Sequence, residues 1–382
     1  MIDLFATVGR GLETFLEAKL REEKAQHVTC YDGKLGFSIE PSSSIIQTLR
    51  SLPFAERLFV KLGVLCYDDL RRNNQPGGVS TWLSDTLVRG LNRAHDDWVR
   101  LQWSYDVNGR KRRKQMTTFR VNFRSSTDRV PMECKPQICG IVAKPFLDQL
   151  GWTADLKRPD VEIYLHAGVT HLFVGIPVQS KSSAERAHIK HAGLRSTICD
   201  AMICLSDIQS GHVLLDPMCG KGTLLVQALC DCPNLAAFAN DSDGTALKYA
   251  AENFEYLSKI DGTSKSLNCM IIQSDARRLP FRDCCIDRIV CDLPFGYRCG
   301  TIADAEAMYP VTAAECFRLL RANGRCVLLT STLLCDALRK TCLTIGFQLI
   351  SEHKIDLGKT TGSILALLKP NDSVAIVLHK SL

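Results

Sequence analysis

The stretch from Val213 to Leu229, VLLDPMCGKGTLLVQAL, decides how the carboxyl-terminal half of this chain is expected to fold. Val213–Leu215 is a short apolar run of the kind found in buried parallel strands. A tight turn with two glycines follows, and Thr223 is placed to cap a helix that continues through Ala228. Strand, glycine turn and helix together predict a nucleotide-cofactor site at the carboxyl end of a sheet strand.

Two better-known glycine loops do not fit this turn. Gly220–Thr223 lacks the spacing of G-x-x-x-x-G-K-[ST], and Leu225 stands where G-x-G-x-x-G needs its third glycine. The Asp216 carboxylate would also repel a pyrophosphate, so S-adenosylmethionine fits better than a nucleotide polyphosphate. Gly220 and Gly222 lack a Cβ, which lets a ligand lie against the backbone. The alternative is an ordinary strand-to-helix turn.

Composition describes an ordinary globular protein of two or three domains. The 382 residues are 46% hydrophobic and 23% charged, and the net charge of +6 suits an anionic partner. None of the 18 cysteines forms a C-x-x-C pair, so no metal site is expected. Met1–Arg10 does not resemble a secretory signal, and no apolar run approaches the ~18 residues of a membrane span. An intracellular protein with free thiols is expected.

The first 180 residues are expected to form two smaller domains. Residues 1–62 read as a small α/β unit, and residues 63–180 change in character. In the second segment the pattern predicts a loop over 68–80, a helix over 82–91 and a strand over 101–105. Two further strands are expected over 161–166 and 171–177. His166 ends the first and His171 begins the second, and a structural role is favoured over metal binding because no third ligand is clustered with them.

Arg110–Lys114 is a run of five cations that precedes the strand-like Thr118–Arg124. Cations beside aromatic strands suit RNA, because cations meet phosphates and rings stack on unpaired bases. A solvated charged loop is an equally good interpretation of the run alone. From residue 181 onward strands alternate with helices, beginning with a long helix over 184–205, which predicts a parallel doubly wound sheet.

Four acidic residues, Asp216, Asp241, Asp275 and Asp292, stand at the predicted carboxyl ends of successive strands. Ligands of open α/β sheets bind along this edge. Asp241 is placed to hydrogen-bond a ribose diol and Asp275 to lie near an adenine amine. Each could instead cap the following helix, but all four at strand tips indicate a ligand site.

The tetrapeptide Asp292-Leu293-Pro294-Phe295 fits the chemistry of a conjugated amine. Such an amine is a poor nucleophile, so a catalyst must bind both N–H groups and turn the nitrogen toward a methyl donor. The Asp292 carboxylate and the backbone carbonyl of Leu293 or Pro294 could accept these hydrogens. Phe295 could stack on the base. The alternative is a simple turn after a buried strand.

These residues resemble the [DN]-P-P-[YF] motif of methyltransferases acting on planar amines, with Leu293 in place of the first proline. D-L-P-F-G together with D-P-M-C-G-K-G-T is similar to the THUMP-domain RNA guanosine methyltransferases. So are the segment from Arg186 to Thr197 and the strand pair Tyr164–Val178. The start, Ala6–Leu16, and A-E-R-L-F-V also resemble this family, so the resemblance extends over nearly the whole chain.

The resemblance implies three domains: a ferredoxin-like domain (1–62), a THUMP RNA-binding domain (63–180) and a Rossmann-like methyltransferase domain (181–382). It implies S-adenosylmethionine-dependent N2-methylation of guanosine in a structured RNA. The branch nearest this sequence is associated with U6 small nuclear RNA and a sister branch acts on tRNA. The nucleus is the favoured location, and the cytoplasm stays open. Eukaryotic members work with a small zinc-containing activator subunit as a heterodimer.

The resemblance also assigns site residues. Three would hold the guanine: Asp292, Pro294 and Phe295. The others would line the cofactor site: Asp216, Cys219, Gly220, Gly222, Thr223, Asp241 and Asp275, with Arg195, Ser196 and Thr197 added. Two competing hypotheses stay open at this point: methylation of adenine or of a glutamine side chain, and a non-catalytic RNA-binding scaffold. Measurable affinity for S-adenosylmethionine separates the scaffold from the enzymes.

Overall fold

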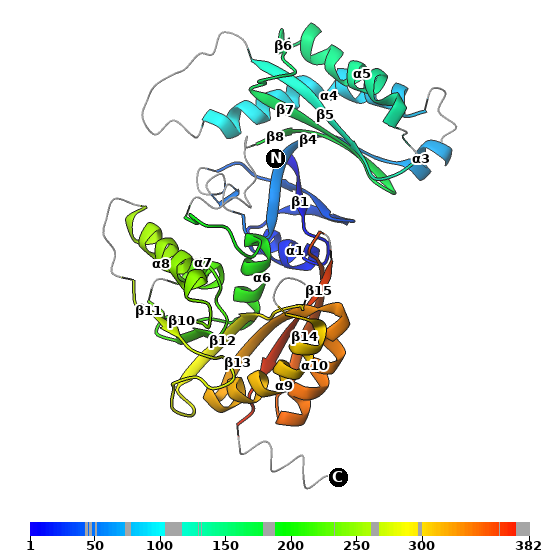
Figure 1. The fold of residues 1–382 in the computed structure, drawn as a ribbon. Coiled ribbons are helices and arrows are strands. Elements are labelled where there is room, and N and C mark those ends of the chain that lie inside the picture. Colours follow the sequence, from blue (N-terminus) through cyan, green and yellow to red (C-terminus); the bar gives the residue numbers. More distant parts are fainter. Residues whose placement is uncertain are drawn as a thin grey trace. The chain divides into compact units, whose positions relative to one another are not determined.

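The computed structural model describes the whole chain apart from residues 43–44, 46–47, 50–51, 73–77, 104–116, 129, 131, 179–187, 233, 261–266, 297–299, 359 and 372–382. The chain divides into two compact units (Figure 1), Met1–Val8 with Leu16–Ser183 and Gly9–Phe15 with Ala184–Leu382. Among the described residues no helix is both long and apolar enough to cross a membrane.

The first unit is built on one mixed sheet in the order β2-β3-β1-β4-β8-β7-β5-β6. Rings from three of its central strands pack together, with Phe5 and Phe59 stacked at 4.9 Å and Phe173 beside them. The strands are β1 (Ile2–Val8), β2 (Gln26–Tyr31), β3 (Lys34–Ile39), β4 (Ala55–Cys66), β5 (Thr118–Ser125), β6 (Thr153–Ala154), β7 (Val161–Ala167) and β8 (His171–Pro177). Because β4 pairs with both β1 and β8, the sheet runs through the expected boundary at residue 62, and the division into 1–62 and 63–180 stays a prediction.

Two expectations for this unit were wrong. Helices α3 (Tyr67–Arg72) and α4 (Gly78–Trp103) occupy most of the expected loop over 68–80 and the start of the expected strand over 101–105. The apolar side chains of α4 recur at helical spacing and are buried: Leu83, Leu87, Leu91, Ala94 and Leu101. The short Leu101-Gln102-Trp103 alternation is therefore the end of a helical stripe. The basic run Arg110–Lys114 lies outside the described residues. Two further helices are α1 (Glu13–Glu22) and α5 (Lys135–Asp148).

The second unit contains the sheet β11-β10-β9-β12-β13-β15-β14. Its strands are β9 (Val213–Asp216), β10 (Ala236–Asp241), β11 (Cys269–Gln273), β12 (Ile286–Asp292), β13 (Leu320–Ser331), β14 (Gln348–Asp356) and β15 (Thr361–Leu368). The first five are parallel, as expected, but β15 runs antiparallel to both β13 and β14. The tight turn in which the Leu357 N–H donates to the Thr360 carbonyl joins β14 to β15 as a hairpin, and a hairpin permits only antiparallel pairing.

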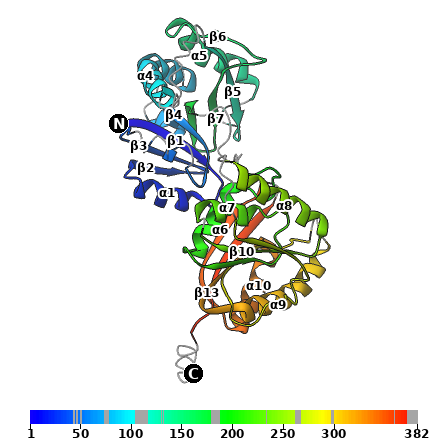
Figure 2. The same ribbon diagram turned by 90° about the vertical axis from the view of Figure 1, so that its left-hand side faces the viewer.

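Helices cover both faces of this sheet (Figures 1 and 2). One group is α6 (Ser196–Ser206), α7 (Thr223–Asp231) and α8 (Gly244–Lys259), and the other is α9 (Ile302–Leu319) and α10 (Thr332–Ile345). The expected helix over 184–205 begins only at Ser196 in the described residues. The backbone N–H groups of Lys190, His191 and Leu194 donate to side chains of α7 and α8, so they are not available to a helix.

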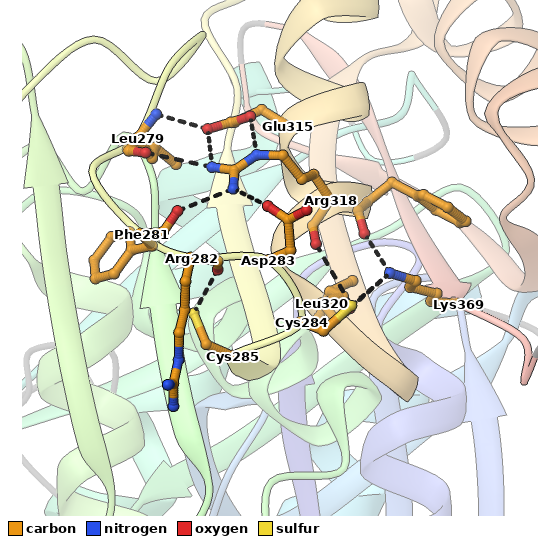
Figure 3. A network of polar contacts seen from close by, with 11 residues as sticks. Leu279, Phe281, Arg282, Asp283, Cys284, Cys285, Glu315, Arg318, Leu320 and Lys369 are labelled. Carbon is orange, nitrogen blue, oxygen red and sulfur yellow. Dashed lines mark hydrogen bonds and ion pairs between the residues drawn. The ribbon is translucent and has the colours of Figure 1, made fainter.

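Arg318 near the end of α9 fixes the loop that enters β12 (Figure 3). Its guanidinium donates to Glu315 through Nε at 2.8 Å and Nη2 at 2.7 Å, to the Phe281 carbonyl at 2.9 Å, and to Asp283. Glu315 in turn accepts the Leu279 N–H at 2.7 Å. The start of the strand that carries Asp292 is thereby tied to α9.

Candidate active site

The glycine loop after β9 has one open glycine and one packed glycine. Gly220 (φ 53°) has no atom within 4 Å of the position a Cβ would take, whereas a Cβ at Gly222 (φ 72°) would lie 3.0 Å from the Phe254 ring and 3.2 Å from Ala250. Gly222 therefore lets α7 and α8 approach each other, and Gly220 leaves space beside the backbone. Thr223 does not cap α7, because Gly222 is the N-cap residue; its hydroxyl accepts the Leu194 N–H at 3.2 Å.

Asp216 is a buried carboxylate at the tip of β9, 1% exposed, and its Oδ1 accepts the Met218 N–H at 3.1 Å. Burial raises the pKa of Asp216 well above its ordinary value, and the charges of Asp292 and Asp241 raise it further. The charges of two other predicted strand-tip carboxylates therefore act on Asp216.

The other two strand-tip carboxylates of this half of the sheet hold their own loops. Asp241 accepts the Gly220 N–H at 2.7 Å through Oδ2 and the Asp243 N–H at 2.9 Å through Oδ1. Asp275 is bonded to Arg277, with Nη2 to Oδ2 at 2.6 Å, and this hydrogen bonding lowers the pKa of Asp275. Contacts of Asp241 with a ribose and of Asp275 with an adenine stay predictions.

The Asp292-Leu293-Pro294-Phe295 segment leaves the sheet as an anchored turn. Leu293 is buried and its N–H donates to the Leu329 carbonyl at 3.0 Å, while the carbonyl of Pro294 accepts the Tyr309 hydroxyl at 2.9 Å. Asp292, Pro294 and Phe295 are partly exposed. One lone pair of the Pro294 carbonyl is therefore already used, which leaves its second lone pair or the Leu293 carbonyl for a substrate amine.

The start of α6 belongs to the same neighbourhood. Burial raises the pKa of the Cys199 thiol, and the nearby charges of Asp292 and Asp216 contribute. Thr197 is fully buried, and among the described residues its Oγ1 has no hydrogen-bond partner. Arg195 is the N-cap residue of α6 and Ser196 its first residue. The assignment of Arg195, Ser196 and Thr197 to the cofactor site stays a prediction.

Cys219 is buried at 7% exposure, and burial raises the pKa of its thiol. Its carbonyl accepts the Gly222 N–H at 2.7 Å and its N–H donates to Asn240, so Cys219 helps to shape the loop. The Cys219 thiol stays neutral in the ordinary pH range and is not a nucleophile there.

These residues fit S-adenosylmethionine. The cofactor carries a sulfonium and an ammonium group, and a cation beside Asp216 would offset both the burial and the charges of Asp292 and Asp241 that raise its pKa. The open space at Gly220 and the orphaned Thr197 hydroxyl offer backbone approach and a polar contact.

Two buried asparagines support the site, and their roles were not predicted from the sequence. Asn253 on α8 accepts from the Lys190 and His191 N–H groups (3.0 and 2.7 Å) and donates to the carbonyls of His191 (3.0 Å) and Lys221 (2.8 Å). Asn240 donates to the Pro217 carbonyl at 2.9 Å. A signal for Asn253 was available, because it lies on the buried stripe of α8 with Leu247, Ala250 and Phe254.

In the described part of the chain, no three His, Cys, Asp or Glu side chains lie close enough together to hold a metal ion. His166 contacts the Ser126 hydroxyl at 3.4 Å, and His171 contacts the Thr170 hydroxyl and packs edge-on against Tyr31. Both histidines have ordinary structural neighbours.

Comparison with known proteins matches two domains. Residues 184–342 match the RMKL-like methyltransferase domain and residues 99–176 the THUMP domain. The bovine U6 snRNA (guanine-N(2))-methyltransferase THUMPD2 is 28% identical over 403 residues, 86% of this chain and 78% of that protein. Its human counterpart is 34% identical over 214 residues, but the match spans only 41% of that protein.

The crystal structure of TrmN from Thermus thermophilus has the same fold, with a TM-score of 0.72 over 97% of this chain and all of that chain at 22% identity. The α/β architecture and the Rossmann-like sheet expected from the sequence are therefore confirmed. The chain therefore has segments that match a THUMP domain and an RMKL-like methyltransferase domain, the two domain types that the sequence resemblance implied.

Proposed function

We propose that this protein is an S-adenosylmethionine-dependent RNA methyltransferase that forms N2-methylguanosine in a structured small RNA. The observation that carries the proposal is that the Asp292-Leu293-Pro294-Phe295 turn follows β12, which pairs directly with the glycine-loop strand β9. The charge of Asp292 also helps to raise the pKa of the buried Asp216. An amine acceptor and a cofactor loop on neighbouring strands are what transfer to a conjugated amine requires.

When bound, S-adenosylmethionine supplies a methyl group on a positively charged sulfur. The residues of this chain position the acceptor. Asp292 and a backbone carbonyl of the turn accept the two N–H hydrogens of the guanine amine, and Phe295 stacks on the ring. No strong base is needed, because methylation makes the nitrogen acidic and its proton then leaves to solvent or to Asp292.

We propose U6 small nuclear RNA as the favoured substrate, tRNA as the next, and the nucleus as the favoured location. Support comes from the relatives: the mammalian THUMPD2 proteins are named for U6 snRNA, and the bovine tRNA (guanine(6)-N(2))-methyltransferase THUMP3 is 34% identical over 199 residues. The THUMP match supports RNA as the substrate class.

We further propose that the protein works as a heterodimer with the small zinc-containing activator subunit. The edge strand β11 supports this proposal, since Met270 is 58% and Ile271 38% exposed on a strand that, within the described part of the chain, pairs with β10 alone. An exposed apolar edge strand is a usual place for a partner to add a strand. The substitution Met270→Lys is expected to abolish co-purification of the two proteins, and unchanged co-purification would place the partner elsewhere.

The test is nucleoside mass spectrometry of U6 and tRNA, each purified separately from cells with and without this protein. Loss of N2-methylguanosine from one pool establishes the reaction and selects the substrate. An unchanged content in both pools, in cells that retain the activator, would overturn the proposal. Incubation of the purified heterodimer with labelled S-adenosylmethionine and each RNA gives the same answer in vitro.

A further inference from the structure

Tyr309 on α9 reaches from the helix layer to the turn that follows β12. It is 2% exposed, and its hydroxyl donates to the Pro294 carbonyl at 2.9 Å. The same hydroxyl lies 2.9 Å from Oγ1 of Thr330, a fully buried residue near the carboxyl end of β13. Tyr309 therefore links α9, β13 and the proposed guanine-binding turn.

The direction of this hydrogen-bond chain follows from proton counting. A phenol has one proton, and Tyr309 gives it to the Pro294 carbonyl, which has none to offer. The second contact must then run from the Thr330 hydroxyl to the Tyr309 oxygen. Burial raises the pKa of Tyr309 to about 12, so the donor persists through the ordinary assay range.

The turn has another anchor at its second residue, where the Leu293 backbone N–H donates to the Leu329 carbonyl at 3.0 Å. This bond and the one from Tyr309 hold the backbone on either side of the peptide that joins Leu293 to Pro294. Since that backbone carries the carbonyls available to a substrate amine, small rotations of the turn would change the reacting geometry while leaving the cofactor loop unaffected.

We propose that Tyr309, supported by Thr330, is a positioning residue that sets the orientation of the Asp292–Phe295 turn for methyl transfer. The inference rests on the proposed function and adds a residue outside the motif. It acts through the backbone of Pro294 and does not touch either substrate. Loss of the hydroxyl is therefore expected to slow the chemical step and leave S-adenosylmethionine binding intact.

The test compares Tyr309→Phe with Thr312→Val in the heterodimer. Thr312 lies on the same buried stripe of α9, and within the described residues its hydroxyl has no hydrogen-bond partner, so its replacement is a matched control. Single-turnover methyl transfer should be about ten-fold slower in Tyr309→Phe, with the dissociation constant of S-adenosylmethionine within two-fold of wild type. Thr312→Val should leave both unchanged.

A second variant keeps the test decisive if Tyr309→Phe folds poorly. Thr330→Val leaves Tyr309 in place but removes the hydroxyl that donates to it. This variant should slow the chemical step less than Tyr309→Phe does. The double variant should be no slower than Tyr309→Phe alone. Wild-type rates in Tyr309→Phe, or a loss of cofactor affinity equal to the loss of rate, would overturn the inference. Absence of turnover in the wild-type heterodimer would instead refute the proposed function itself.

Discussion

The carboxylate of Asp241 accepts the backbone N–H of Gly220 at 2.7 Å, so the tip of β10 holds the glycine loop that follows β9. A charged acceptor on a backbone N–H makes a strong hydrogen bond. Asp241 can therefore preorganise the loop whether or not it also meets a ribose.

Replacement of Asp241 by alanine is expected to weaken S-adenosylmethionine binding at least ten-fold. Asp241→Asn retains an oxygen acceptor and should lose less. Isothermal titration calorimetry measures both, with Asp243→Asn, at the N-cap of α8, as the control for helix capping. Equal affinities for the alanine and asparagine variants would show that the Gly220 bond does not matter.

Asp216 should make the cofactor-free protein pH-sensitive. Its folded pKa lies above the unfolded value near 3.8, so between the two pKa values the folded state keeps a proton that the unfolded chain has lost. Stability therefore falls as pH rises through this window, and Asp216→Asn should remove this contribution. Melting temperatures of both proteins across pH test the sign; parallel curves would contradict it.

The same carboxylate should make cofactor binding pH-dependent. A cationic ligand favours ionised Asp216, so binding releases a proton and affinity rises with pH until Asp216 is ionised in the free protein. Calorimetry in buffers of different ionisation enthalpy counts the proton. Asp216→Asn is expected to bind more weakly and to release none.

Asp292→Ala is expected to abolish methyl transfer and to leave S-adenosylmethionine affinity within a few-fold of wild type, because the carboxylate holds the acceptor amine. Asp292→Asn, which keeps one oxygen acceptor, should retain a trace of activity. Radiolabel transfer to RNA and cofactor titration separate the two effects. Wild-type turnover in the alanine variant would show that the role assigned to Asp292 is wrong.

Asn253→Ala removes four hydrogen bonds at once and leaves backbone groups of Lys190, His191 and Lys221 unpaired. The free energy of unfolding should fall by about 2–4 kcal/mol, and cofactor affinity should fall with it because the glycine loop loses its support. The exposed Glu255→Ala on the same helix is the control. Chemical denaturation gives the stability, and similar curves for both variants would contradict the prediction.

Arg318→Gln should reduce stability without a specific effect on catalysis. Arg318 joins Glu315, Asp283 and two backbone carbonyls, and a loss of about 2 kcal/mol is expected. Arg321→Gln, which affects one ion pair with Asp287 at 2.7 Å, should cost under about 1 kcal/mol. Below its melting temperature Arg318→Gln should retain the wild-type rate; a selective loss of rate would link this network to the site.

The local sequence pattern was enough to locate the strand, glycine loop and helix at the centre of the methyltransferase sheet. Val213–Leu215 and the turn to Gly222 carry their own strand and turn signals, and the structure places β9 and α7 as expected. The parallel pairing of β9 with β10 and β12 also follows from alternating strands and helices.

Features that depend on distant partners were not predictable. Tyr309 bonds Pro294 fifteen positions away, and Asn253 bonds Lys190 across sixty-three. Segment 188–195 has a helical composition, but side chains of α7 and α8 take its backbone N–H groups. Such contacts exist only after the sheet has assembled, and local propensity carries no information about them.

Strand β4 has a consequence for how the first unit unfolds. It pairs with β1 on one side and β8 on the other, where Phe59 lies opposite Pro177, and the Phe5–Phe173 ring contact at 5.7 Å crosses the expected boundary. A fragment that starts at residue 63 would lose most of its central strand and expose the hydrogen-bonding edge of β8. The residues matching the THUMP domain should therefore melt in one cooperative transition with the amino-terminal strands, and a soluble RNA-binding fragment needs both.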